Sequence, residues 1–149
     1  TVMNGDGEIR EVPAADLSLS YRRSLFPDDW IVTSLTFKVY PQAPEETLKI
    51  MTEHKNYRIK SQPHNVRTAG STFKNPQGLK AWELIKKSGC ADLRINKAKV
   101  SEKHCNFLVN EGGASARDIE ALGEKIIEKV KNETSITLEW EVKRIGINK

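Results

Sequence analysis

The hydrophobic period of the chain changes near residue 133, and this change does most to limit the folds that the chain can adopt. Upstream of it, aliphatic side chains recur at the spacing of one helix face: Ile119, Leu122, Ile126, Ile127 and Val130. Downstream, from Thr134 to Ile145, apolar and polar residues alternate as they do in a strand with one buried face. The sequence therefore predicts a helix capped by Ser115 that runs to about Asn132, with Asp118 in its first turn, followed by a strand.

Shorter elements are predicted before this pair. Turn residues at 4–7 separate the apolar runs Thr1–Met3 and Ile9–Val12, which indicates a β-hairpin. The segment Trp30–Tyr40 is rich in β-branched and aromatic residues and predicts a strand. A further short strand is expected at His104–Val109.

Two more helices are expected in the middle of the chain. The first begins at Pro44, because proline is tolerated in a first turn, and should continue to about Lys55 with Leu48 and Met51 facing inward. The second covers Leu79–Ser88. Its inward side chains are expected to be Ala81, Trp82 and Ile85. Helices and strands do not follow strict βαβ order, so the predicted fold class is α+β.

The composition excludes several classes of protein. With 149 residues, 38% hydrophobic and 30% charged, the chain suits one globular domain or a small domain with part of another. No apolar run approaches the roughly 20 residues that span a bilayer, so no membrane partner is expected. The net charge is +4, but most lysines alternate with glutamates, and no basic stripe is interleaved with several aromatic residues. We therefore expect no nucleic-acid partner.

The cysteine and histidine residues show no metal-binding pattern. Cys90 and Cys105 are spaced neither as a zinc knuckle nor as a CxxC redox pair, so buried free thiols in a reducing cytoplasm are expected. His54, His64 and His104 do not have the spacing of metal ligands. The sequence therefore predicts no metal site.

Three polar segments could carry chemistry, and each also has an ordinary structural explanation. The glycine-bearing segment Ala69–Thr72 could let a ligand approach its backbone, with Ser71 exchanging a proton, or it could be a simple turn. No GxSxG elbow surrounds Ser71, so a serine hydrolase is not favoured. Glu139 and Glu141 share one face of the predicted strand, either as site carboxyls or as solvent-exposed residues. The Tyr-Arg-Arg-Ser cluster at 21–24 could bind a carboxylate or a phosphate through its arginines.

Four motifs, in this order along the chain, resemble those of the UDP-N-acetylenolpyruvoylglucosamine reductase family. They are YRRS at 21–24, GSTFKNP at 70–76, SEKHCNFLVN at 101–110 and LEWEVKRIG at 138–146. No tyrosine-bearing insertion lies between positions 39 and 71, so the chain is similar to the shorter of the family's two types. It departs from the usual pattern in having Asn96-Lys97 and Asp92 where glycines are common, which bears on the turn before His104.

The resemblance implies a two-step flavin reaction. In the family, NADPH reduces FAD, and the flavin passes hydride to the double bond of UDP-N-acetylglucosamine enolpyruvate, which gives UDP-N-acetylmuramate for the bacterial cell wall. By motif, Arg22 and Glu141 would stabilise the enolate, and Ser71 would donate the proton that completes the reduction. Glu141 would need to be protonated or to share a proton, for example beside Glu139, because a bare carboxylate repels an enolate. The substrate site would be lined by Tyr21, Lys74, Asn75 and His104.

The resemblance also divides the chain. Residues 1–42 resemble the C-terminal tail of the second FAD-binding subdomain, and residues 43–149 resemble the complete substrate-binding domain. Most of the FAD site would lie outside this sequence, so the chain alone is expected to be inactive and not to hold FAD tightly. The expected parent is a monomeric cytoplasmic reductase. The alternative, from another class, is a non-catalytic domain that binds a UDP-sugar or another anionic ligand.

Overall fold

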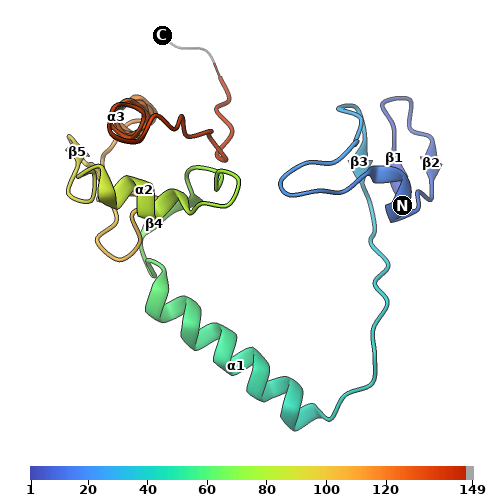
Figure 1. Cartoon of the computed structure of the whole chain (residues 1–149). Coiled ribbons are helices and arrows are strands. Elements are labelled where there is room, and N and C mark those ends of the chain that lie inside the picture. Colours follow the sequence, from blue (N-terminus) through green and yellow to red (C-terminus); the bar gives the residue numbers. More distant parts are fainter. Residues whose placement is uncertain (147–149) are drawn as a thin grey trace. The chain divides into compact units, whose positions relative to one another are not determined.

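The computed structural model describes residues 1–146 and divides the chain into two compact units, Thr1–Glu46 and the part that begins at Thr47 (Figure 1). Each unit has its own antiparallel sheet. Together with the α-helices, these sheets confirm the predicted α+β class. The expected domain limits, 1–42 and 43–149, remain a prediction, and the last three residues of the second lie outside the described residues.

The first unit is built on a three-stranded sheet. β1 (Val2–Met3) lies between β2 (Ile9–Arg10) and β3 (Ile31–Val32) and is antiparallel to both. Asn4 shapes the turn from β1 to β2, because its Oδ1 accepts hydrogen bonds from two backbone N–H groups of that turn, at 3.1 and 2.8 Å. The predicted hairpin is therefore confirmed.

The predicted strand Trp30–Tyr40 is wrong over most of its length. Only β3 is paired, and residues 33–43 have no regular structure. Apolar side chains of this segment are exposed, among them Phe37 (75%) and Val39 (81%). A strand needs a partner for its backbone N–H and C=O groups, and β1, beside which β3 lies, has only two residues. The other element of this unit is a short 3₁₀ helix, η1 (Ala14–Leu17).

Helix α1 (Pro44–Ser61) begins where it was predicted and continues well beyond the predicted end at Lys55. None of its side chains is buried, so the inward orientation predicted for Leu48 and Met51 is wrong; they are 65% and 62% exposed. The helix carries acidic residues in its first turn and basic residues in its last, which favours it electrostatically at both ends. Its length therefore depends on local helix stability rather than on a buried apolar face.

Four short antiparallel strands form the sheet of the second unit, in the order β4-β7-β6-β5. Their bounds are β4 (Arg67–Ser71), β5 (Arg94–Ile95), β6 (Ala98–Val100) and β7 (Phe107–Asn110). β7 overlaps the predicted strand His104–Val109, whereas the other three strands were not predicted. The turn between β5 and β6 is Asn96-Lys97. Asn96 adopts a φ of 49°, a left-handed conformation that asparagine tolerates better than most residues, so this turn forms without glycine.

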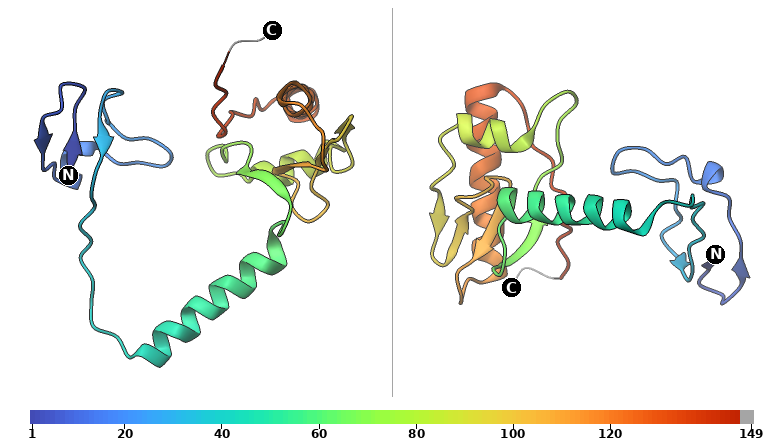
Figure 2. Two further views of the ribbon diagram at one scale, coloured as in Figure 1. Left: turned by 180° about the vertical axis from the view of Figure 1, so that it is seen from behind. Right: turned by 90° about the horizontal axis from the view of Figure 1, so that it is seen from below.

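Two helices complete the core of the second unit. α3 (Ala116–Thr134) packs across β5, β6 and β7, and α2 (Ala81–Lys87) packs against α3 (Figure 2). Trp82 was predicted to face this core, and that prediction is wrong: its side chain is 38% exposed. The core is formed by buried apolar residues of both helices and the sheet, including Ala81, Ile85, Ala98, Val100, Leu108, Leu122, Ile126 and Val130.

Local signals at the N-terminus of α3 act as predicted. The Ser115 Oγ accepts a hydrogen bond from the Asp118 N–H at 3.1 Å, and the Asp118 carboxylate accepts one from the Ser115 N–H at 2.8 Å. This reciprocal pair satisfies two backbone donors that a helix start otherwise leaves free. The amphipathic helix and its cap are therefore confirmed.

The C-terminal segment is only partly the strand that was predicted for Thr134–Ile145. α3 extends to Thr134, and Ser135 ends it with a φ of 60°. The residues that follow alternate in burial, with Leu138 only 2% exposed between exposed neighbours. Up to residue 146, they form one isolated β-bridge with the rest of the unit, between Trp140 and Phe73. The alternating sequence pattern therefore predicted the buried face of this segment correctly, but it overestimated how many of its residues pair with another strand.

Candidate functional site

Ser71 lies at the end of β4, beside a break in the regular ladder. The register between β4 and β7 shifts between Thr68 and Ser71, and Gly70 adopts a φ of 90° at the shift. Such a φ strongly favours glycine, and an irregularity of this kind changes the direction in which the next side chain points. Ser71 pairs with Phe107 across the ladder and is half-buried. The local sequence thus places a hydroxyl at the irregular edge of the sheet.

Glu141 comes to this edge from the far end of the chain. Its backbone N–H donates to the Thr72 carbonyl at 2.8 Å, and the Lys74 N–H donates to the Glu139 carbonyl at 2.8 Å. With the Phe73–Trp140 bridge between them, these bonds set Glu141 opposite Thr72, the residue after Ser71. Glu141 is half-buried. Two of the predicted catalytic residues therefore belong to adjacent, hydrogen-bonded segments.

Two charged residues beside this edge, Lys74 and Glu139, form an ion pair with each other. Lys74, predicted to bind substrate, forms an ion pair with Glu139, with 3.2 Å between Nζ and Oε2. The side chain of Glu139 is 67% exposed and that of Lys74 is 31% exposed. An exposed pair of this kind contributes little stability, so Lys74 remains able to exchange Glu139 for another anion.

Asn75 and His104 lie on two loops of the same unit. The Asn75 Oδ1 accepts a hydrogen bond from the N–H of Ala81, the first residue of α2, at 2.9 Å. The His104 Nδ1 accepts one from the Asn106 N–H at 3.3 Å, and its ring lies 4.9 Å from the Phe107 ring. Burial lowers the pKa of His104, which favours the neutral imidazole. With Nδ1 accepting, the proton belongs on Nε2, which is then a donor for a ligand.

Asn106 is a residue of this site that the sequence analysis did not single out. It is 4% exposed, and its side chain is hydrogen bonded to the backbone of Phe73. The only signal available was its position within the motif SEKHCNFLVN, directly before the apolar residues of β7.

Arg22 and Tyr21 are described only within the first unit. The Arg22 guanidinium lies 5.4 Å from the centre of the Tyr21 ring, and Arg22 adopts a φ of 57°. The position of Arg22 relative to Ser71 and Glu141 therefore remains a prediction.

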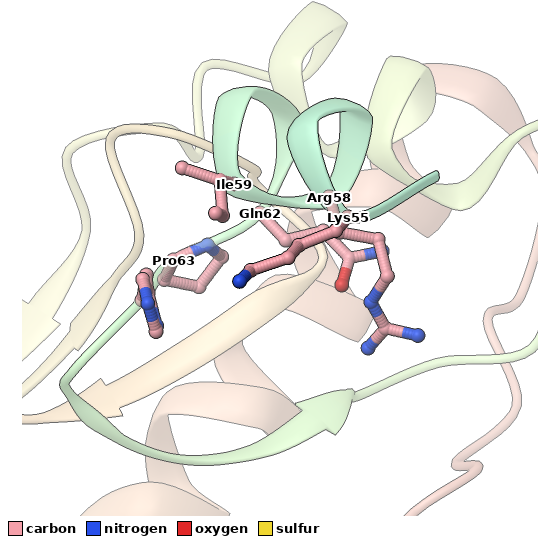
Figure 3. A pocket seen from close by; sticks show the side chains of 6 residues that line it. Lys55, Arg58, Ile59, Gln62 and Pro63 are labelled. Carbon is pink, nitrogen blue, oxygen red and sulfur yellow. The ribbon is translucent and has the colours of Figure 1, made fainter. Parts of the chain in front are cut away.

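Two hollows are described in the second unit. One, of about 200 Å³, adjoins the candidate site and has a mainly apolar lining. It is lined by Arg67, Thr68, Ala69, Thr72, Leu108, Asn110, Ile119, Trp140 and Val142, which are sequence neighbours of Ser71 and Glu141 but do not include them. The other, of about 340 Å³, lies at the end of α1 and in the loop that follows (Figure 3). Two of its lining side chains, Lys55 and Arg58, are cationic, but both are exposed, so they do not form a site of fixed geometry for an anion.

Neither hollow fits a flavin dinucleotide. Their volumes lie at or below the lower end of the roughly 300–1,000 Å³ that is typical of sites for drug-sized ligands. Within residues 1–146, no group of three or more potential metal ligands lies together. None of the helices in the described part of the chain is both long and apolar enough to cross a bilayer. Cys90 and Cys105 are buried free thiols, and burial raises the pKa of each.

Comparison with known proteins agrees with the motifs. Residues 62–145 match the family described as UDP-N-acetylenolpyruvoylglucosamine reductase, C-terminal domain. The reductase of Rhizorhabdus wittichii is 49% identical over 142 residues, which cover 95% of this chain and 46% of that protein. The reductase of Parvibaculum lavamentivorans is 49% identical over 135 residues, which cover 91% of this chain and 44% of that protein. The chain thus spans about half the length of these relatives.

A solved structure gives the same result. The crystal structure of UDP-N-acetylenolpyruvylglucosamine reductase from Thermus caldophilus superposes with a TM-score of 0.80 at 37% identity. The match covers 94% of this chain and 50% of the other. The family match extends over more than half of the chain, and the relatives agree with it. The chain therefore belongs to the UDP-N-acetylenolpyruvoylglucosamine reductase family.

Proposed function

We propose that this chain supplies the substrate-binding part of a cytoplasmic, FAD-dependent reductase. The enzyme would use NADPH to convert UDP-N-acetylglucosamine enolpyruvate to UDP-N-acetylmuramate, a precursor of peptidoglycan. Membership of the family supports the reaction class. The observation that carries the assignment of the site is the 2.8 Å hydrogen bond from the Glu141 N–H to the Thr72 carbonyl, which joins the segment of Glu141 to that of Ser71.

The proposed division of labour leaves the flavin to the part of the enzyme that this sequence does not span. When bound there, it would supply the hydride that reaches the β-carbon of the enolpyruvyl group. Residues 1–42 would be the tail of the second FAD-binding subdomain, and residues 43–149 would bind the substrate. With most of the flavin site proposed to lie outside this sequence, we expect this chain alone to be inactive and to retain no flavin.

The residues of this chain would manage charge and the proton. Arg22 and Glu141 would stabilise the enolate that forms as the β-carbon gains hydride. Ser71 would donate its hydroxyl proton to the α-carbon, so that hydrogen is added across the double bond. A serine hydroxyl is a weak acid in water, and donation requires a strongly basic intermediate in a shielded place. The half-buried position of Ser71 supports such shielding.

The remaining site residues would hold the substrate. Lys74 could exchange its exposed partner Glu139 for an anionic group of the sugar nucleotide. His104, neutral with Nδ1 occupied, could donate from Nε2. Asn75 and Tyr21 complete the proposed substrate contacts.

The proposal is tested in a chimera in which this chain replaces the 142 aligned residues of the Rhizorhabdus wittichii reductase. We expect Ser71→Ala to leave flavin reduction by NADPH nearly unchanged. Reoxidation of the reduced flavin by saturating enolpyruvyl substrate should slow by about 10²–10⁴-fold, the usual contribution of general acid catalysis. Ser71→Cys keeps a proton donor and should recover part of the rate.

A matched control and a clear contrary result accompany this test. Ser61→Ala removes a hydroxyl whose described partner is the Tyr57 carbonyl on α1, and it should leave both half-reactions unchanged. If Ser71→Ala reoxidises within a few-fold of the unmodified chimera, Ser71 is not the proton donor. If the unmodified chimera binds the sugar nucleotide but reduces nothing, the non-catalytic binding domain becomes the better assignment.

A further inference from the structure

The side chain of Asn106 forms an unusual contact with the backbone next to Ser71. Its Oδ1 accepts a hydrogen bond from the Phe73 N–H at 2.9 Å, and its Nδ2 donates to the Phe73 carbonyl at 2.8 Å. The Asn106 carbonyl also accepts from the Thr72 N–H at 2.7 Å. One residue therefore makes three hydrogen bonds to two consecutive residues of the candidate site.

These bonds replace a missing piece of the β-ladder. β7 begins at Phe107, and the chain before it turns, with the Phe107 N–H donating to the His104 carbonyl at 3.0 Å. The backbone of β7 is thus not available to pair with Phe73, which is only 1% exposed. An amide side chain carries one acceptor and two donor hydrogens, so it can take both roles of a strand partner. Without it, two buried backbone groups would lose their described partners.

The other edge of the same segment is hydrogen bonded to the segment that carries Glu141. The Thr72 carbonyl accepts from the Glu141 N–H, and the Lys74 N–H donates to the Glu139 carbonyl, both at 2.8 Å. If Phe73 shifted toward or away from Asn106, Thr72 would move with it. Thr72 both follows Ser71 and accepts the hydrogen bond of the Glu141 N–H, so the spacing between Ser71 and Glu141 would change.

We propose that Asn106 is a positioning residue of the reductase: it fixes the Thr72–Phe73 backbone, and through it the spacing between Ser71 and Glu141. This inference rests on the proposed function. Asn106 does not need to touch the substrate, because its side chain acts on the backbone of Phe73.

Asn106→Asp is the sharpest perturbation, because it keeps the shape of the side chain and changes one atom. The variant retains the acceptor for the Phe73 N–H, but an ionised carboxylate puts a second acceptor against the Phe73 carbonyl. Only the protonated acid can restore that bond. The variant should therefore recover as pH falls. His104, whose Nδ1 accepts from the N–H of residue 106, also gains a proton as the pH falls. Each rate is therefore divided by that of the unmodified chimera at the same pH.

Asn110→Asp is the matched control on the same strand. Asn110 also uses its amide on backbone groups, accepting from Gly112 and Ala114 and donating to the Ala114 carbonyl, but these belong to the turn before α3. It should lower thermal stability without changing the substrate half-reaction. The two variants therefore separate a general loss of packing from a loss of positioning.

The first measurement is flavin reoxidation at saturating substrate between pH 6 and 8.5, in the chimera described above. At the alkaline end we expect Asn106→Asp to slow this step by about 10–100-fold, as small misplacements of reacting groups do. The deficit should shrink toward pH 6, while NADPH-driven flavin reduction stays normal. A rate within threefold of the unmodified chimera at every pH, or an equal loss in Asn110→Asp, overturns the proposal.

The second measurement does not depend on the reaction. Amide hydrogen exchange in the 149-residue chain at pH 8 should be faster at Thr72 and Lys74 in Asn106→Asp than in Asn110→Asp. The Phe73 N–H keeps its acceptor in the variant and is not used as a readout. Unchanged protection at both Thr72 and Lys74 refutes the positioning role, whatever the activity. An inactive unmodified chimera, in contrast, refutes the proposed function, so the two failures can be told apart.

Discussion

Replacing Gly123 with alanine tests how the C-terminal segment is held on α3. Gly123 is buried on the helix, and the Trp140 indole lies over it. A Cβ at this position would lie 2.0 Å from the Trp140 Cη2 and 2.4 Å from its Cζ2. Ordinary contact begins at 3.4 Å, so the ring would have to withdraw by about 1.4 Å. Trp140 is followed by Glu141, and its withdrawal would disturb the proposed site.

The magnitude follows from two opposing effects. Overpacking of a close contact costs about 1–3 kcal/mol. Alanine in place of glycine inside a helix stabilises it by about 1 kcal/mol. The net loss should be about 0–2 kcal/mol, equivalent to a fall in Tm of up to roughly 10 °C for a unit of this size. In a Trp140→Ala background the clash is absent, and the same Gly123→Ala change should stabilise by about 1 kcal/mol.

The assay is a double-mutant cycle. Urea and thermal unfolding of the four proteins, followed by far-ultraviolet circular dichroism, give the free energy of unfolding of each. The interaction term between positions 123 and 140 should be about 1–3 kcal/mol, which exceeds the usual departure from additivity at independent sites. If Gly123→Ala stabilises both backgrounds equally, the indole does not rest on the glycine, and the reasoning fails.

Three further predictions concern stability and reactivity. Ser115→Ala removes the cap of α3 and should lower the free energy of unfolding by about 1 kcal/mol in urea melts. Because burial lowers the pKa of His104, the unfolded chain takes up this proton first. The free energy of unfolding should therefore be at its full value above the ordinary histidine pKa of 6.5 and should decrease as the pH falls below it. His104→Gln should make the free energy of unfolding less dependent on pH in this region. The raised pKa values of Cys90 and Cys105 predict slow reaction with a disulfide reagent at pH 8 and fast reaction in denaturant.

Elements with strong local signals were predictable from the sequence. The helix α3 combines a regular apolar face with the Ser115 cap, so neighbouring residues alone specify it. The hairpin of β1 and β2 likewise depends on the turn that begins at Asn4. Short strands such as β4 and β5 lack such signals, because two to five residues are too few to show a period. Their existence depends on partners that are distant in sequence.

The same limit applied to side chains whose environment is set by tertiary packing. Leu48 and Met51 have the spacing of a buried helix face, yet α1 buries none of its side chains. Trp82 sits beside Ala81 on α2 but turns toward His104, with 6.3 Å between the ring centres. A hydrophobic pattern identifies which face of an element can be buried, and only the fold decides whether something covers it.

For the candidate site, residue types alone did not decide whether Ser71 is a site residue or part of an ordinary turn, nor whether Glu141 is a site carboxyl or a solvent-exposed strand residue. The motif resemblance selected both, and the structure shows that the segments carrying them are adjacent. Asn106 could not be selected in either way, because its role depends on Phe73, which lies 33 positions upstream. Positioning residues of this kind act through backbone geometry, which a sequence pattern does not display.

Phe73 lies between Asn106 and Trp140 and contacts both. Its backbone is hydrogen bonded to Asn106 on one side, and its ring lies 5.1 Å from the Trp140 ring on the other. Trp140 in turn rests on Gly123 and donates from Nε1 to the Glu124 carboxylate at 3.0 Å. The segments of Ser71 and Glu141 therefore meet across a residue that is 1% exposed and belongs to the core. The spacing of these two segments is therefore set by packing within the second unit.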